Sequence, residues 1–180
     1  MPDPANSFVM PGMPFPLQEG APSAWILALA PERVRIDFEA GSVKEVLEEA
    51  GFLFAASTEL SAARVSEGLM ERERLASTAL GQGMALPHAR IKGLRKPLAA
   101  FIRLSRPISF EAPDNQPVAD VFILLVPEQA TELHLQMLAA IADRFADPAF
   151  RARLHQQKDA FSAYDVLASD AGMPSPGQTG

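Results

Sequence analysis

The chain has 180 residues, of which 48% are hydrophobic and 21% are charged, and its formal net charge at pH 7 is −6. This length and this balance are typical of one globular domain that can bury a hydrophobic core. The acidic balance argues against a nucleic-acid-binding protein, which needs a basic face. Cysteine is absent, so the sequence holds no disulfide and no thiolate zinc site.

The sequence shows no targeting segment and no membrane span. Arg33 is the first basic residue, so the short apolar stretch at residues 25–30 lacks the positive flank of a signal peptide. No run approaches the roughly 20 apolar residues that a spanning helix needs. We therefore expect a cytoplasmic protein without membrane insertion.

The two ends of the chain differ in composition from its middle. Residues 1–22 contain six prolines, at positions 2, 4, 11, 14, 16 and 22. This density opposes helices and strands and predicts a disordered N-terminal arm. Residues 23–170 form the predicted domain, and the polar residues 171–180 form a predicted disordered tail.

Predicted elements of the first half follow in chain order. Residues 23–30 favour a short helix, and the alternation at residues 34–38 predicts a half-buried strand. Ser42 and Glu45 have the spacing of a capping box, so a helix should begin there, and Gly51 should end or weaken it. A second helix is predicted at residues 61–73.

The second half adds strands and then helices. Residues 98–104 and the alternating residues 108–111 predict two strands, and the nearly continuous apolar run at residues 120–126 predicts a strand buried on both faces. A helix follows from about residue 131 to Asp147, and residues 149–157 and 159–168 predict two closing helices. The interleaving indicates an α/β fold: a single domain with a small mixed β-sheet flanked by helices.

The stretch most suggestive of chemistry is residues 77–88, which reads Ser-Thr-Ala-Leu-Gly-Gln-Gly-Met-Ala-Leu-Pro-His. Histidine is suited to accept a proton or a phosphoryl group near neutral pH. Pro87 restrains the backbone that presents His88. The amides of the turn around Gly81 and Gly83 could hold phosphoryl oxygens. Taken alone, the pattern leaves open a loop histidine without chemistry.

Residues 72–88, 110–118 and 124–127 resemble the type-2 enzyme IIA family of the bacterial phosphotransferase system, and its nitrogen-regulatory branch in particular. The resemblance spans roughly residues 30–168, so residues 23–170 are interpreted as an enzyme IIA type-2 domain. It implies that His88 carries a phosphoryl group received from an HPr-like phosphocarrier protein. Sensor kinases and potassium transporters are candidate regulatory targets. A IIB domain of this system uses cysteine, so no fused IIB is expected.

The resemblance also implies two further active-site residues. Arg72 lies sixteen residues before His88, and His134 occupies the position of a second histidine. The planar guanidinium suits phosphate oxygens, and a neutral histidine at the positive end of a helix suits a nearby anion. Ser77 and Thr78 either donate hydroxyls to the phosphoryl group or only cap the loop.

The remaining charged residues receive plainer interpretations. Arg90, Lys92, Arg95 and Lys96 form a basic cluster that we interpret as a solvated loop able to attract a phosphorylated or acidic partner. His155 should lie on a solvent-exposed face. The three histidines lack the spacing of metal ligands, so we expect no metal site and no cofactor.

The sequence departs from the resembled family at Ala79 and Ala89, where glycine is usual. If either position required a positive φ, alanine would cost on the order of 1 kcal/mol. Two alternative functions stay open. One is a sugar-specific IIA, for fructose or mannitol, that passes phosphate to a separate IIB protein. The other is a binding module that is not phosphorylated.

Overall fold

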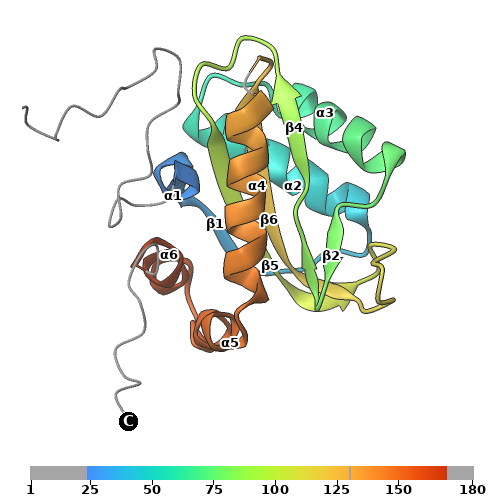
Figure 1. Ribbon diagram of the computed structural model, residues 1–180, viewed down its shortest axis with the longest axis vertical. Coiled ribbons are helices and arrows are strands. Elements are labelled where there is room, and N and C mark those ends of the chain that lie inside the picture. The colour runs from blue at the N-terminus through green and yellow to red at the C-terminus, as the bar shows by residue number, and fades with distance from the viewer. Residues whose placement is uncertain (1–23, 130, 170–180) are drawn as a thin grey trace, which may run out of the picture.

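The computed structural model describes residues 24–129 and 131–169 (Figure 1). The arm expected at residues 1–22 and the tail expected at residues 171–180 lie outside this described part. Helices cover both faces of one mixed sheet, which confirms the predicted single α/β domain. In chain order the elements are α1 (Ala24–Ala28), β1 (Leu29–Phe38), α2 (Val43–Ser57), α3 (Ala62–Leu75), β2 (Ala79–Gly81), β3 (Met84–Ala85), β4 (His88–Ile91), β5 (Leu98–Ile108), β6 (Val118–Pro127), α4 (Thr131–Ala146), α5 (Pro148–Gln156) and α6 (Ala160–Ser169).

The sheet is organised around β5 and β6, which are long and antiparallel to each other. The strand order is β1-β5-β6-β3-β2, and β4 also pairs with β6. β1 is parallel to β5, whereas β3 and β4 are both parallel to β6. β3 and β4 therefore follow the same side of β6, with Leu86 and Pro87 between them.

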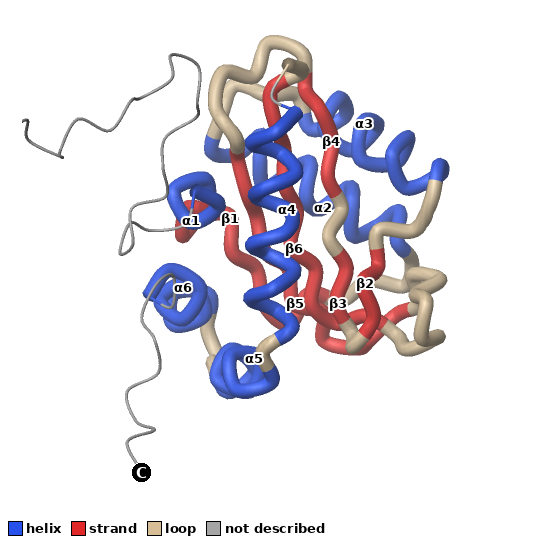
Figure 2. Tube along the Cα trace, viewed as in Figure 1, coloured by secondary structure: helices blue, strands red, loops and turns tan. Residues whose placement is uncertain are grey.

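Side chains alternate across the sheet, so the sheet separates two hydrophobic clusters. Phe122 and Leu124 of β6 pack with α1, α4, α5 and α6, whereas Ile123 and Leu125 pack with α2 and α3. Figure 1 shows α4 in front of the sheet with α2 and α3 behind it, and Figure 2 shows the strands between these helices. All four side chains are fully buried, which confirms the predicted strand with two buried faces.

Two local predictions are wrong. Gly51 does not end a helix, because α2 continues to Ser57. A Cβ at Gly51 would lie 2.5 Å from Ala62 O, so this glycine is needed for the close approach of α2 and α3. Residues 109–111 form no strand, and Ile108 is instead the last residue of β5.

The predicted helix starts are confirmed, but the first strand begins earlier than expected. Ser42 and Ser61 are the N-cap residues of α2 and α3, and each side chain accepts a hydrogen bond from a backbone amide. β1 begins at Leu29 and includes Pro31. Proline cannot donate to a sheet ladder, and β1 tolerates it because it is an edge strand.

Candidate active site

His88 lies where β4 resumes the ladder along β6. Pro87 has no amide hydrogen and interrupts the path between β3 and β4. Its carbonyl nonetheless accepts a hydrogen bond from Leu124 N (3.0 Å), and Leu86 N donates to Thr78 O (3.0 Å). Backbone hydrogen bonds to β6 and to the residue just before β2 therefore fix the residues that precede His88.

One tautomer of His88 satisfies both of its hydrogen-bonding partners. Nδ1 lies 2.8 Å from Leu86 O, and a carbonyl only accepts, so Nδ1 carries the hydrogen. Arg72 Nε donates to His88 Nε2 over 3.3 Å, and a guanidinium only donates, so Nε2 carries the lone pair. The neutral ring thus has its nucleophilic nitrogen on the side of Arg72.

Helix α4 places His134 next to His88. The ring centroids are 5.1 Å apart and the ring planes meet at 71°. His134 is only 7% exposed, and neither of its ring nitrogens has a hydrogen-bond partner within the described residues. Buried polar atoms are usually hydrogen-bonded, so these two nitrogens are available to a group that binds beside His88.

Both histidines are kept in the neutral form. Burial lowers the pKa of His88, the hydrogen bond to Leu86 opposes that shift, and the charge of Arg72 adds to it. Burial, followed by the charges of His88, Arg90 and Arg72, lowers the pKa of His134 to about 4. At neutral pH the two imidazoles are therefore uncharged, and the positive charge near them belongs to arginine.

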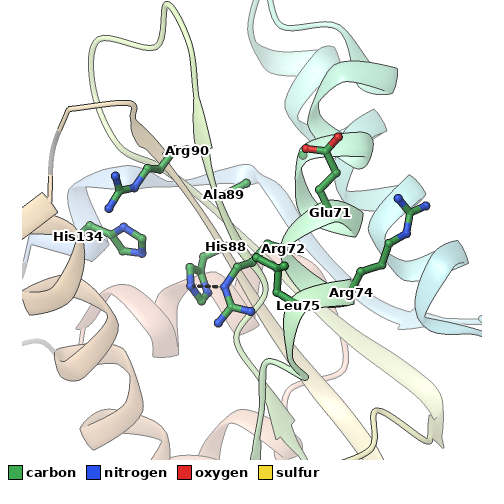
Figure 3. A pocket seen from close by; sticks show the side chains of 9 residues that line it. Glu71, Arg72, Arg74, Leu75, His88, Ala89, Arg90 and His134 are labelled. Atoms are coloured by element: carbon green, nitrogen blue, oxygen red, sulfur yellow. Dashed lines mark hydrogen bonds between the residues drawn. The ribbon is translucent and has the colours of Figure 1, made fainter.

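The two histidines line one open cleft of about 750 Å³ (Figure 3). α3 contributes Arg72 to this cleft and β4 contributes Arg90. Its charged lining residues are Glu71, Arg72, Arg74 and Arg90. Cations outnumber the carboxylate, so the cleft favours an anion. The three residues predicted to act together, Arg72, His88 and His134, are thus brought to one place by α3, β4 and α4.

Ser77 and Thr78 line a smaller cleft of about 320 Å³ that also contains His88. Their hydroxyls are engaged within the protein. Ser77 Oγ donates to the carbonyl of Phe110, and Thr78 Oγ1 donates to Glu73 Oε2 over 2.6 Å. A hydroxyl has one hydrogen to donate, so these contacts favour the loop-capping interpretation over donation to a phosphoryl group.

The Gly81–Gly83 turn lies away from His88. Gly81 and Gly83 have φ of 93° and 81°, so the turn between β2 and β3 needs the conformational freedom of glycine. Gly83 O accepts a hydrogen bond from Asp120 N, whereas His88 pairs with Leu124. Those two positions are separated by about 13 Å along β6. The expectation that the amides of this turn cradle a phosphoryl group on His88 does not fit this placement.

Ala79 and Ala89 occupy ordinary strand positions. They lie within β2 and β4, and neither is among the residues with positive φ. Both side chains are buried in the cluster formed with α2 and α3. Alanine therefore introduces no backbone strain at either position.

His155 has a partner that the sequence did not reveal. Its side chain is 48% exposed, but Nε2 lies 2.6 Å from Oδ2 of Asp120, whose side chain is 3% exposed. The hydrogen bond to Asp120 raises the pKa of His155. The expected solvent-facing histidine is thus also a tether between α5 and β6.

The described part of the chain contains neither a candidate metal site nor a helix able to span a membrane. Within residues 24–129 and 131–169, no group of three or more His, Asp or Glu side chains could hold a metal ion. None of the helices described there is long and apolar enough to cross a membrane. Sequence reasoning expected that a backbone carbonyl could fix the tautomer of His88, but it could not name Leu86, because a backbone oxygen carries no sequence signal. It also missed the role of Glu73, which is one of several charged residues on α3.

The sequence from residue 28 to residue 170 matches the family described as "Phosphoenolpyruvate-dependent sugar phosphotransferase system, EIIA 2". The chain belongs to this family. The resemblance found in the motif around His88 is thereby confirmed. Proteins of this family carry phosphoryl groups, so the chain is a phosphoryl carrier of the phosphotransferase system.

Several relatives belong to the nitrogen-regulatory branch. The chain is 41% identical over 140 residues to the nitrogen regulatory protein of Bradyrhizobium diazoefficiens, and this match covers 78% of the chain and 92% of the relative. It is 39% identical over 140 residues to that of Pseudomonas aeruginosa, which covers 77% and 91%. The crystal structure of nitrogen regulatory protein IIA-Ntr from Neisseria meningitidis is 42% identical, with a TM-score of 0.74 and coverage of 79% and 97%. The predicted branch is therefore confirmed.

Proposed function

We propose that His88 Nε2 accepts a phosphoryl group from the phosphohistidine of an HPr-like carrier, and that regulatory targets respond to the resulting phosphorylation state. The observation that carries the proposal is the tautomer of His88. Leu86 O holds the hydrogen on Nδ1, which leaves the Nε2 lone pair at the cleft. An unprotonated nitrogen on a restrained backbone is what nucleophilic attack on phosphorus requires.

The phosphoryl transfer needs no reactant other than the donor phosphohistidine and His88. The P–N bond of the donor breaks as the bond from phosphorus to His88 Nε2 forms, and the donor imidazole keeps the electron pair of the broken bond. The His88 ring then bears positive charge, and its Nδ1–H continues to donate a hydrogen bond to Leu86 O. This hydrogen bond is stronger to a charged donor, so the Leu86 carbonyl stabilises the phosphorylated ring.

Arg72 and His134 stabilise the negative charge on the phosphoryl oxygens. Phosphoryl transfer proceeds through a loose transition state with charge on the equatorial oxygens, so positioning and electrostatics supply most of the catalysis. Arg72 Nε donates to His88 Nε2 in the unphosphorylated protein. It must release this lone pair before attack, and the incoming oxygens are its natural replacement. His134 can donate one neutral N–H to the same group.

The rim of the cleft suits a protein partner. Leu75 lines the cleft and is 83% exposed, and Leu135, which follows His134 in α4, is 66% exposed. Exposed apolar side chains around a charged centre are typical of a docking surface. Phosphorylation adds about −1.5 to −2 charges there, by analogy with phosphorylated hydroxyls. A target that binds the free form over this rim would have to desolvate that charge, so phosphorylation should weaken its binding. Sensor kinases and potassium transporters are the classes of target to test.

The alternatives are weaker on specific grounds. A sugar-specific IIA would share the chemistry at His88, but the relatives described above are nitrogen regulatory proteins. The binding-module alternative relied on Ala79 and Ala89, and neither alanine has a strained backbone.

The test is direct phosphorylation. The protein is incubated with a phosphorylated HPr-like carrier, and its mass is measured without exposure to acid, which would hydrolyse a phosphohistidine. The parent should gain one phosphoryl group. His88→Gln should gain none while retaining a cooperative thermal transition.

His155→Gln is the matched control, because it also removes an imidazole but lies at α5. It should be phosphorylated like the parent. Labelling of His88→Gln to the parental extent would reject His88 as the acceptor.

A further inference from the structure

Arg90 faces the cleft and has no hydrogen-bond or ion-pair partner among the described residues. Ala89 and Ile91 of β4 pack in the cluster with α2 and α3. Because side chains alternate along a strand, Arg90 projects to the opposite face, the same face as His88. Its Cα lies about 7 Å from that of His88, two residues along the strand. Within the described residues the Arg90 guanidinium makes no hydrogen bond and no ion pair.

Arg90 also lies on the other side of the nucleophile from Arg72. In Figure 3, Arg90 extends toward His134, whereas the guanidinium of Arg72 contacts His88 from the α3 side. The charge of Arg90 contributes to the lowered pKa of His134, which agrees with this proximity. A cation that is unpaired within residues 24–129 and 131–169 is thus held near two histidines whose rings are neutral.

The basic cluster noted in the sequence is divided by the fold. Lys92 and Arg95 line a separate pocket with residues of the β4–β5 loop and of α3. Arg90 belongs instead to the cleft of His88. The interpretation of these residues as one solvated loop is therefore wrong for Arg90, and the alternation of β4 is the reason.

We propose that Arg90 is a catalytic residue that binds the phosphoryl oxygens during transfer to His88. Arg72 and Arg90 then hold the group from two sides, and their two positive charges match its charge of about −1.5 to −2. A guanidinium offers paired N–H donors in a plane, the geometry that suits phosphate oxygens. The inference rests on the proposed function and adds a second cationic contact to it.

The step that Arg90 assists is the one already described. As the donor P–N bond lengthens and the bond to His88 Nε2 forms, negative charge remains on the three equatorial oxygens. Arg72 occupies the α3 side of the ring, and on the opposite side His134 offers only a neutral N–H, so the oxygens there lack a cationic donor. Arg90 supplies it without gaining or losing a proton, because a guanidinium stays charged.

The test compares two phosphoryl donors in single-turnover experiments at saturating donor. One is a phosphorylated HPr-like carrier, and the other is phosphoramidate, a small molecule that has a P–N bond and no docking surface. Arg90→Gln should slow transfer from both donors by about tenfold or more, since it removes a charge-assisted contact to the reacting group. Arg90→Lys should have an intermediate rate, because it keeps the charge but loses the fork.

Lys92→Gln is the matched control. It removes one positive charge close in sequence, from a residue of the separate loop pocket. It should transfer from phosphoramidate at the parental rate. The thermal transition of Arg90→Gln should match that of the parent, because the Arg90 side chain is exposed and makes no bond within the described residues.

Three outcomes overturn the inference. If Arg90→Gln transfers from both donors at the parental rate, Arg90 does not touch the phosphoryl group. If it slows transfer only from the protein donor, Arg90 docks the partner instead. If Lys92→Gln slows phosphoramidate transfer equally, the effect is general surface charge. Labelling of His88→Gln in the same assay would reject the proposed function itself, and is therefore distinguishable from a failure at Arg90 alone.

Discussion

Two histidine environments lie on one face of the same sheet and have opposite electrostatics. His88 and His134 share a cleft with arginines, and the pKa of each is lowered. His155 reaches from α5 to the buried Asp120 of β6, and its pKa is raised. His88 pairs with Leu124 of β6, so the two environments are separated by about 13 Å along that strand.

The comparison shows that neighbours from other elements decide what a histidine does. Burial and cations favour the neutral ring, which keeps a lone pair for chemistry. A buried carboxylate favours the charged ring, which makes a tether. The same residue type therefore has two opposite electrostatic environments within one small domain, and the two can be tested against each other.

The largest expected effect is on phosphoryl transfer. Arg72→Gln removes the guanidinium that contacts His88 Nε2, and it should slow transfer from a phosphorylated HPr-like carrier by about 10²–10³-fold. Its unfolding free energy should fall by only about 1 kcal/mol, since Arg72 also donates to Ala76 O at the end of α3. Rates are measured by rapid quench and stability by urea denaturation. Equal rates for Arg72→Gln and the parent would make Arg72 a structural residue.

The next effect is acid sensitivity in the cleft. The pKa of His134 is about 4 in the fold, below its unfolded value of 6.5, so the unfolded state binds more protons between these values. Stability is then lost as pH falls from about 6.5 to 4. Relative to His134→Gln, the parent should lose on the order of 3 kcal/mol over that window. Denaturation curves at a series of pH values measure the difference, and parallel curves for the two proteins would contradict the burial of a neutral His134.

The smallest effect concerns His155, whose contribution to stability should fall as pH rises, opposite to that of His134. The raised pKa of His155 means that its contribution is fully present below the unfolded pKa and is lost as pH rises through the folded pKa. His155→Gln leaves the buried Asp120 carboxylate without its charged partner, so it should cost about 1–2 kcal/mol at mildly acidic pH and less at alkaline pH. The same denaturation series provides the measurement. A cost that grows with pH would show that the charged pair does not form.

Local sequence determined most of the framework. Alternation located part of β1, apolar runs located β5 and β6, and serine caps located the starts of α2 and α3. These features depend on neighbours within a few residues, which a sequence displays directly. The motif ending in Pro87-His88 identified the family for the same reason, because its residues are contiguous. Gly51 was misjudged because its role depends on contact with Ala62 of another helix.

Only the tertiary structure decided which residues share the site. Arg72, His88, Arg90 and His134 come from α3, β4 and α4, and the sheet brings them to one cleft. In the folded chain the Gly81–Gly83 turn lies away from His88. The hydroxyls of Ser77 and Thr78 donate hydrogen bonds to Phe110 O and to Glu73. The sequence by itself determined that a restrained histidine exists and that the fold is α/β, since both follow from local pattern. The tautomer of His88, its neutral state and its cationic neighbours depend on distances between segments that are far apart in the sequence. Those distances are set only once the chain has folded.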